Sequence, residues 1–219
     1  MAKFGPPRPW VYWIVKNVLF ICYKLFFRLR CFGAENVPSD QNPRGVILAP
    51  NHASFLDPPI PGIWLGRHVT YLAKDYLFRV PVLGWGLRSV GTFPIRTEVD
   101  DFRTIRDLVR MLKAGACVVV FPEGTRSLDG EFRDPESGVG FLAMKSKAAV
   151  VPVYIDGTFQ AFPKGVKMFR CHPVRAFYGV PFVPAEDEAI LKAQDPYAAV
   201  SARIMTEIRK LKESVQAVK

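Results

Sequence analysis

The sequence lacks the motifs of several large functional classes. No segment matches the phosphate-binding pattern GxxxxGK(S/T), no GxGxxG is placed between a strand and a helix, and no cysteine, histidine or acidic cluster has metal-ligand spacing. Nucleotide hydrolysis, nicotinamide binding and metal chemistry therefore lack their usual residues, and we expect neither a cofactor nor a metal. Internal repeats and low-complexity blocks are missing as well.

Cysteine is scarce in this chain. Its 219 residues include four cysteines without CxxC spacing, too few for a fold built on disulfides. Cys117 lies inside an apolar run that is typical of a buried strand. The spacing of Cys22 and Cys31 leaves a bridge between them open, but the pattern as a whole predicts reduced thiols and exposure to the cytosol.

A long uncharged apolar run is also missing. The segment from Trp10 to about Leu29 is apolar and aromatic, but Lys16 and Lys24 interrupt it, so it falls short of the eighteen or so uncharged residues expected of a spanning helix. Early prolines, the two lysines and the lack of a small-residue cleavage site disfavour a secretory signal. We expect this segment not to cross a bilayer.

The same N-terminal segment has the pattern of an amphipathic helix. Its polar positions recur at roughly a helical period, which predicts a helix lying in the membrane interface. A helix that docks on its own domain or forms a dimer contact is the alternative. Phe20 and Phe27 favour the membrane, because both fall near the polar side, where a globular surface disfavours large aromatics. The residues predicted on the broad apolar face include Trp10, Trp13, Ile14, Leu25 and Leu29.

Positive charge is in excess. The chain has 30 Lys and Arg residues against 20 Asp and Glu, a formal net charge of +10. Such an excess suits nucleic acid, an acidic membrane surface or phosphorylated substrates. Several basic residues lie in or beside the apolar N-terminal segment rather than along a polar stripe, which favours a membrane surface over nucleic acid as the partner.

Short apolar runs alternate with helical patterns after the proline-containing link 37–44. This alternation is typical of an α/β fold. We predict a single α/β domain with a mixed, mostly parallel central sheet flanked by helices, in which residues 1–36 form a membrane-associating helical segment and 37–219 the catalytic domain. The pattern predicts strands over 46–49, 69–73, 117–121 and 150–155, and helices over 60–66, 102–113, 139–147 and about 197–212.

The segment NHASFLD, residues 51–57, offers a base and a group to orient it. A tight turn folds Asp57 back onto His52, so that the carboxylate accepts one imidazole N–H and the other ring nitrogen is free to take a proton from an alcohol. His52 also follows a predicted strand, at the carboxyl end where α/β sheets collect ligands. A histidine followed five residues later by aspartate arises by chance in about one such chain in five, and Asp57-Pro58 is also typical of a helix N-cap.

The segment FPEGTRS, residues 121–127, offers an anion site. It leaves a predicted strand, turns at Gly124, and presents Arg126 together with backbone N–H groups and the hydroxyls of Thr125 and Ser127. Phosphate suits such a loop.

Two further cations strengthen the anion-site interpretation. Arg96 ends the segment GTFPIR, and Lys74 directly follows the predicted strand over 69–73, so several cations are expected at one sheet edge. The alternative is a local ion pair between Glu123 and Arg126 that closes a turn.

These segments together resemble a known family. NHASFLD, GTFPIR, FPEGTRS and the strand VVPV at 150–153 are similar, in order and spacing, to the four blocks of the glycerolipid acyltransferases, and most similar to the bacterial lysophosphatidic acid acyltransferases. The similarity runs from about Arg44 to Pro181, and the ordered blocks together are highly specific. The N-terminal helix resembles the membrane-embedded helices of that family.

The resemblance implies a role for each matching residue. His52 is the general base and Asp57 its orienter. Arg96 and Arg126 bind the phosphate of the acceptor. The residues implied to bind substrate are Lys74, Arg96, Glu123, Gly124, Thr125 and Arg126.

Three departures from the family pattern leave the exact acceptor open. Ile95 stands where many members carry aspartate before the arginine, and Tyr76 replaces a glutamate two residues after Lys74. The insertion-like segment 134–137 displaces an expected lysine-glycine pair.

The resemblance implies transfer of an acyl chain from acyl-CoA or acyl carrier protein to the free hydroxyl of lysophosphatidic acid, giving phosphatidic acid. It also implies a monotopic enzyme on the cytoplasmic face of a membrane, the inner membrane of a bacterium. Another acceptor, such as glycerol-3-phosphate or another lysophospholipid, stays open. A non-catalytic module that binds anionic lipid is the alternative from another class, but it leaves His52 and Asp57 idle.

Overall fold

A six-stranded sheet forms the centre of the computed structural model, which describes residues 8–95 and 102–217. The strand order is β1-β8-β7-β2-β6-β3, and only the β7–β8 pair is antiparallel. The strands are β1 (Arg30–Phe32), β2 (Val46–Pro50), β3 (Val69–Thr70), β6 (Cys117–Val119), β7 (Ala149–Asp156) and β8 (Arg175–Tyr178). A separate parallel pair joins β4 (Leu72–Lys74) to β5 (Phe93–Ile95).

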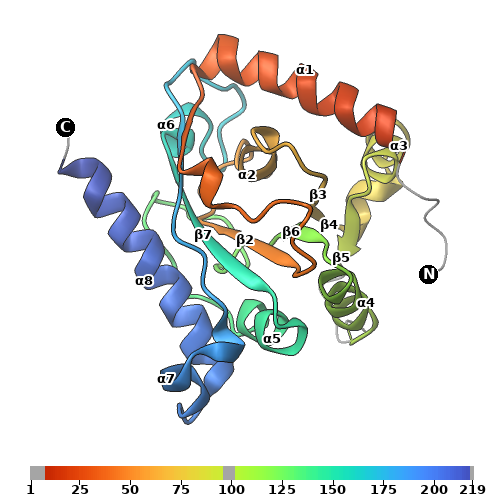
Figure 1. Cartoon of the computed structure of the whole chain (residues 1–219). Coiled ribbons are helices and arrows are strands. Elements are labelled where there is room, and N and C mark those ends of the chain that lie inside the picture. Colours follow the sequence, from red (N-terminus) through yellow and green to blue (C-terminus); the bar gives the residue numbers. More distant parts are fainter. Residues whose placement is uncertain (1–7, 96–101, 218–219) are drawn as a thin grey trace.

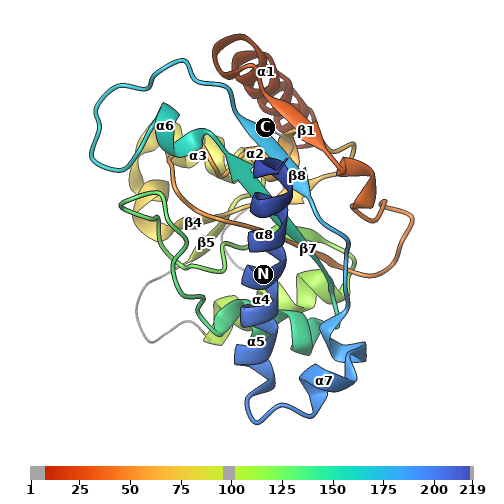
Figure 2. The same ribbon diagram turned by 90° about the vertical axis from the view of Figure 1, so that its left-hand side faces the viewer.

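Helices cover both faces of the sheet (Figure 1). One layer holds α1 (Pro9–Phe27) and α2 (Ile60–Ile63), and the other holds α4 (Phe102–Lys113), α5 (Gly138–Ser146) and α8 (Pro196–Gln216). The view turned by 90° shows α1 and α7 at opposite ends of the molecule (Figure 2). The remaining helices are α3 (Pro81–Ser89), α6 (Thr158–Ala161) and α7 (Glu188–Leu191), with 3-10 turns η1 (Ala34–Asn36), η2 (Asp75–Arg79) and η3 (Pro184–Glu186).

The central strand β2 contributes to a core on each side of the sheet. Val46 and Leu48 pack in the core under α1 and α2, whereas Ile47 and Ala49 pack in the core under α4, α5 and α8. All four side chains are fully buried. A strand with both faces covered by helices needs apolar residues at every position, because neither side meets water. This is why β2 is a continuous apolar run in the sequence.

The predicted fold class is confirmed. The helix over 102–113 has the predicted bounds, and strands and helices lie at or near the other predicted ranges. The range 69–73 differs, because it contains two strands: Val69 and Thr70 pair with β6, whereas 72–74 pairs with β5. The helix predicted over 60–66 is only one turn long.

Several short elements are absent from the sequence prediction, among them β1, β8 and α3. Strands β1 and β8 have three and four residues, too short for a clear alternation. Helix α3 contains Gly84 and Gly86, which lower helix propensity and hide the pattern. All four cysteines are free thiols, and burial raises the pKa of Cys31 and of Cys117 to about 12.

Helix α1 docks on its own domain through one face. The Tyr23 hydroxyl donates to the carbonyl of Leu56 at 2.7 Å, and the Val69 N–H donates to the Tyr12 hydroxyl at 3.0 Å. The ammonium group of Lys16 donates to the Leu65 carbonyl. This face of α1 therefore docks on its own domain, as the alternative to a membrane-facing helix predicted.

The opposite face of α1 exposes apolar side chains. These are Trp10, Trp13, Ile14, Val18, Ile21, Leu25 and Phe26. The inference from Phe20 and Phe27 was wrong, because Phe27 is buried and Phe20 packs on Trp64 with ring centroids 5.2 Å apart. Leu29, predicted on the apolar face, is buried beyond the helix end. By length and composition alone α1 is able to span a membrane.

Candidate active site

The two motif segments meet at one edge of the sheet. Strands β2 and β6 are parallel neighbours, with Leu48 opposite Val119, so both carboxyl ends reach the same edge. The segments that follow are bonded directly: the His52 N–H donates to Glu123 Oε1 at 2.7 Å, and the Ser127 N–H donates to the His52 carbonyl at 2.8 Å. Two segments about 70 residues apart in sequence thus form one site.

His52 and Asp57 form the predicted pair. His52 Nδ1 lies 2.9 Å from Asp57 Oδ2, and the same oxygen accepts the N–H groups of Ala53 at 2.7 Å and Ser54 at 2.6 Å. The Asp57 side chain is fully buried. An ionised carboxylate only accepts hydrogen bonds, so Nδ1 carries the proton and Nε2 keeps its lone pair.

The His52 ring is held in place and still reachable. It stacks on Phe121 with centroids 4.0 Å apart, and its side chain is 15% exposed. Within the described ranges, Nε2 has no hydrogen-bond partner among protein groups. A neutral imidazole with one fixed and one free nitrogen has the arrangement of a general base.

Asn51 is a positioning residue that the sequence analysis did not single out. Its side-chain amide donates to the Ile155 carbonyl at 3.1 Å, and its Oδ1 accepts the Ile155 N–H at 2.7 Å. These bonds tie the end of β2 to β7, so the residue before His52 is anchored. The only signal in the sequence is that a polar amide follows a buried strand, and its partner more than 100 residues away is not readable there.

Glu123 braces the two segments against each other. Glu123 is 2% exposed. Its Oε1 accepts a hydrogen bond from the His52 N–H, and its Oε2 accepts one from the Arg133 N–H at 2.8 Å. Burial raises the pKa of Glu123, while these two N–H groups lower it in part. Because both oxygens bind backbone, the alternative of a local ion pair with Arg126 was wrong.

Changing Glu123 to glutamine is expected to destabilise the protein. Glutamine has one acceptor oxygen, so its NH2 group faces one of the two N–H donors. Losing a hydrogen bond to a charged group costs about 1.5–3 kcal/mol, which urea unfolding measures. Glu131→Gln, at an exposed position, is the matched control and should cost less than about 1 kcal/mol. Equal stability of the two variants would contradict the bracing role.

One hydrogen-bond donor of the Arg126 guanidinium has no partner among the described residues. This guanidinium lies 3.5 Å from the ring centroid of Phe55, and that donor nitrogen, an Nη, is buried. The loop before it turns at Gly124, whose φ of +64° suits glycine and whose Cα faces the carboxylate of Glu136. An arginine fixed against an aromatic face with an unused donor is suited to an anion.

The other described residues that the sequence analysis singled out lie in different surroundings. Lys74 is exposed at the end of β4, opposite Ile95 of β5. Arg96, the next residue, lies outside the described residues, so the gathering of cations stays a prediction. Thr125 lines a cleft beside the site. Ser54 is buried and donates its hydroxyl to the Phe162 carbonyl at 2.6 Å, which makes it a structural residue.

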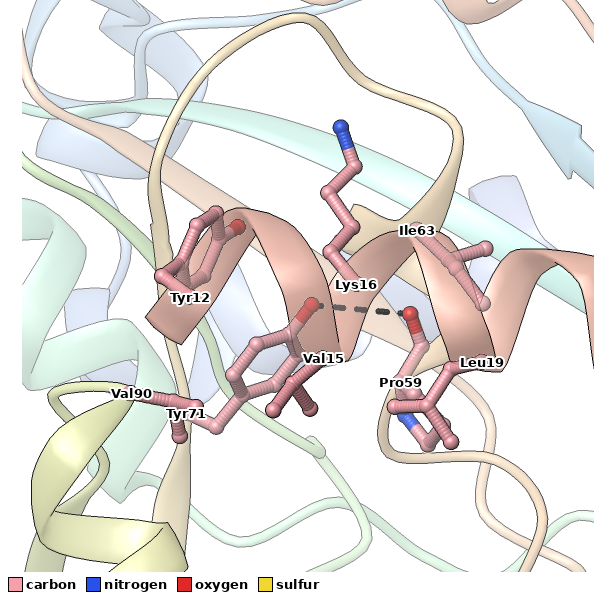
Figure 3. Close-up of a pocket in the computed structure, with 8 residues that line it drawn as sticks. All are labelled: Tyr12, Val15, Lys16, Leu19, Pro59, Ile63, Tyr71 and Val90. Carbon is pink, nitrogen blue, oxygen red and sulfur yellow. Dashed lines mark hydrogen bonds between the residues drawn. The ribbon is translucent and has the colours of Figure 1, made fainter. Parts of the chain in front are cut away.

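A cleft lies beside the second motif. It has about 370 Å³ of space and is partly open to solvent, and its lining includes Glu123, Thr125 and Arg133. A much smaller apolar hollow of about 40 Å³ lies under α1 and contains none of the site residues (Figure 3). The described residues hold no cluster of three metal-ligating side chains. The smaller hollow is lined by Tyr12, Val15, Lys16, Leu19, Pro59, Ile63, Tyr71 and Val90.

The sequence matches known proteins over most of its length. The profile of the family described as Acyltransferase matches residues 28–156. A chloroplastic 1-acyl-sn-glycerol-3-phosphate acyltransferase of Arabidopsis thaliana is 35% identical over 145 residues, covering 64% of this chain and 39% of the relative. The chain spans about two fifths of the length of this and the similar plant and algal relatives.

Two bacterial proteins match along nearly the whole chain. The 1-acyl-sn-glycerol-3-phosphate acyltransferase of Bacillus subtilis is 26% identical over 206 residues, covering 94% of this chain and 98% of the relative. The crystal structure of the 1-acyl-sn-glycerophosphate (LPA) acyltransferase of Thermotoga maritima superposes with a TM-score of 0.75 at 25% identity, covering 97% of this chain and 84% of that one.

Proposed function

Because the chain belongs to the acyltransferase family, we propose that it transfers an acyl chain from an acyl thioester to the free hydroxyl of lysophosphatidic acid, giving phosphatidic acid. The donor is acyl-CoA or acyl carrier protein. The names of the bacterial and plant relatives support this acceptor. The observation that carries the proposal is the His52–Asp57 pair, bonded at 2.9 Å beside an arginine with an unused donor.

The proposed reaction needs one proton shuttle. His52 Nε2 takes the hydroxyl proton as the acceptor oxygen attacks the thioester carbonyl, and Asp57 stabilises the imidazolium that forms. The tetrahedral intermediate then collapses, the carbon–sulfur bond breaks, and the imidazolium returns the proton to the leaving thiolate. A new ester and a free thiol result, and no acyl-enzyme is needed.

A thiol-release assay tests the proposal. Purified protein is mixed with acyl-CoA or acyl carrier protein as donor and with lysophosphatidic acid, glycerol-3-phosphate or lysophosphatidylethanolamine as acceptor. We expect thiol release and phosphatidic acid only when donor and lysophosphatidic acid are both present. No release with any pair would refute acyl transfer and would favour the lipid-binding module. Turnover with another acceptor alone would refute lysophosphatidic acid as the substrate.

Changing Arg126 to lysine is expected to weaken acceptor binding. Lysine keeps the charge but loses the planar fork that binds phosphate in two places. A charged hydrogen bond contributes about 1.5–3 kcal/mol, so the KM for lysophosphatidic acid should rise roughly tenfold to a hundredfold. The KM for the thioester should change little, and Arg209→Lys on the exposed face of α8 is the control. A rise confined to the thioester KM would assign Arg126 to the donor instead.

We propose that α1 lies along the membrane surface rather than across the bilayer. Both substrates carry acyl chains, and the exposed side of α1 is apolar and aromatic. A spanning orientation would break the hydrogen bonds of Tyr12, Lys16 and Tyr23 to the domain. Attachment to the cytoplasmic face of a bacterial inner membrane is part of the same proposal.

Placing aspartate on the outer side of α1 is expected to release the protein from vesicles. Ile14 and Leu25 are 55% and 72% exposed, so Ile14→Asp and Leu25→Asp leave the docked face intact. Burying a Leu or Ile side chain contributes about 1.5–3 kcal/mol, so the double variant should bind at least about tenfold more weakly in vesicle sedimentation. Leu191→Asp on α7 is the control. Binding equal to that of the control would exclude α1 from the membrane contact.

A further inference from the structure

The loop between α6 and β8 carries unopposed positive charge. Lys164, Lys167 and Arg170 lie in this loop, residues 163–170, and their side chains are exposed. The sequence from Gly157 to Val174 contains no aspartate or glutamate. None of the three cations forms an ion pair in the part of the chain that the structure describes. The loop is therefore a local cationic surface.

Apolar side chains alternate with these cations. Val166, Met168 and Phe169 are 41%, 79% and 47% exposed. Among the residues that the structure describes, no ring or hydrogen-bond contact accounts for the exposed side chains of Val166 and Met168, and Phe169 stays about half-exposed. Cations that alternate with exposed apolar side chains are typical of a segment that binds an anionic membrane surface.

The 163–170 loop continues the exposed side of α1. The Phe169 ring packs on Phe26 and Phe27 of α1, with centroids 6.0 and 5.5 Å apart. Phe26 is itself half-exposed, and Leu25 beside it is more so. Both views place the loop at the end of the molecule where α1 lies (Figures 1 and 2).

The base of the loop is bonded to the active-site segment. Pro163 forms a β-bridge with Ser54, and the Phe162 carbonyl accepts the Ser54 hydroxyl. The Phe162 ring lies 5.6 Å from that of Phe55, which in turn carries the Arg126 guanidinium. The base of the loop is thus linked through Phe162 and Phe55 to Arg126.

From these contacts we propose that the 163–170 loop is a second membrane contact, distinct from α1, that binds an anionic lipid surface and holds it beside Arg126. The cations contact phosphate headgroups, and Val166 and Met168 enter the interfacial region. Helix α1 supplies apolar anchoring, whereas the loop supplies selectivity for anionic lipid. A bilayer seated on both elements presents its headgroups at the entrance to the site.

Vesicle sedimentation with matched variants tests this proposal. The charge variant is Lys164→Gln with Lys167→Gln and Arg170→Gln, and the apolar variant is Val166→Ser with Met168→Ser. The control removes three exposed cations on α4, on α5 and directly after α7, at the end of the molecule opposite α1: Lys113→Gln, Lys145→Gln and Lys192→Gln. Each protein is titrated with phosphatidylcholine vesicles that contain or lack phosphatidylglycerol.

We expect the charge variant to bind phosphatidylglycerol vesicles roughly tenfold to a hundredfold more weakly than the control, since each cation near an anionic surface strengthens binding about fivefold. Added salt should shrink this difference. On vesicles without phosphatidylglycerol the charge variant should bind as strongly as the control. The apolar variant should bind more weakly than the control to both kinds of vesicle. A charge variant that binds phosphatidylglycerol vesicles as the control does would overturn the proposal.

A second measurement tests whether the loop instead contacts a second copy of the chain. If sedimentation velocity shows that the wild type self-associates and that the charge variant does not, with equal vesicle binding, the loop contacts a second copy and the proposal is wrong. Folding is checked by turnover of a short-chain, water-soluble lysophosphatidic acid, which both loop variants should keep. A wild type without turnover would refute the proposed acyl transfer but would leave the vesicle comparison as the test of the loop.

Discussion

Changing His52 to alanine is expected to lower kcat/KM for acyl transfer about a hundredfold to ten-thousandfold. A positioned general base contributes about 10²–10⁴-fold. The measurement is thiol release at saturating donor with lysophosphatidic acid as acceptor. The imidazole makes one hydrogen bond and one ring contact, so the variant should stay folded and should still sediment with vesicles.

His172→Ala is the matched control for this change. His172 is exposed and forms no part of the site, so its replacement should leave turnover unchanged. If His52→Ala retains more than about a tenth of wild-type turnover, His52 is not the base, because general-base catalysis alone exceeds that factor.

Changing Asp57 to asparagine is expected to lower kcat about a hundredfold to ten-thousandfold with a small change in KM. With its oxygen in the place of Oδ2, the neutral amide still accepts from His52 Nδ1 but carries no charge, so it holds the imidazole less firmly. It also no longer stabilises the imidazolium that forms as the hydroxyl proton moves. The amide oxygen still accepts from the N–H groups of Ala53 and Ser54, so the turn should survive.

The split between kcat and KM separates positioning by Asp57 from a purely structural role. A carboxylate that positions the base acts on the step in which the hydroxyl proton moves, so the loss should appear in kcat while the KM values of both substrates stay close to those of the wild type. A matching rise in KM would indicate a distorted site, and a kcat near that of the wild type would contradict the pair as described.

The local part of the site was readable from the sequence, because it depends on short separations. His52 and Asp57 are five residues apart, and one turn is enough to join them. The apolar runs of β2 and β6 were also clear, and two parallel strands place their following loops at the same edge. The predicted pair, the predicted loop and the fold class follow from these two facts.

The long-range part was not readable. Glu123 bonds the backbone of His52 and Asn51 bonds Ile155, and each contact depends on strand order and register rather than on a local pattern. Helix α1 shows the same limit. Its pattern showed that one side is apolar, but the shape of the underlying domain determines which arc docks, and Phe27 lies on that arc.

The double attachment of His52 to the second motif has a consequence for engineering acceptor preference. Its N–H donates to Glu123 and its carbonyl accepts from Ser127, so His52 is tied to both ends of the segment 123–127. Loop grafts from relatives that replace Glu123 or Ser127 would shift His52, the proposed proton acceptor, along with the proposed headgroup contacts. Productive chimeras therefore need both junction residues retained, with variation confined to Gly124, Thr125 and the segment beyond Ser127.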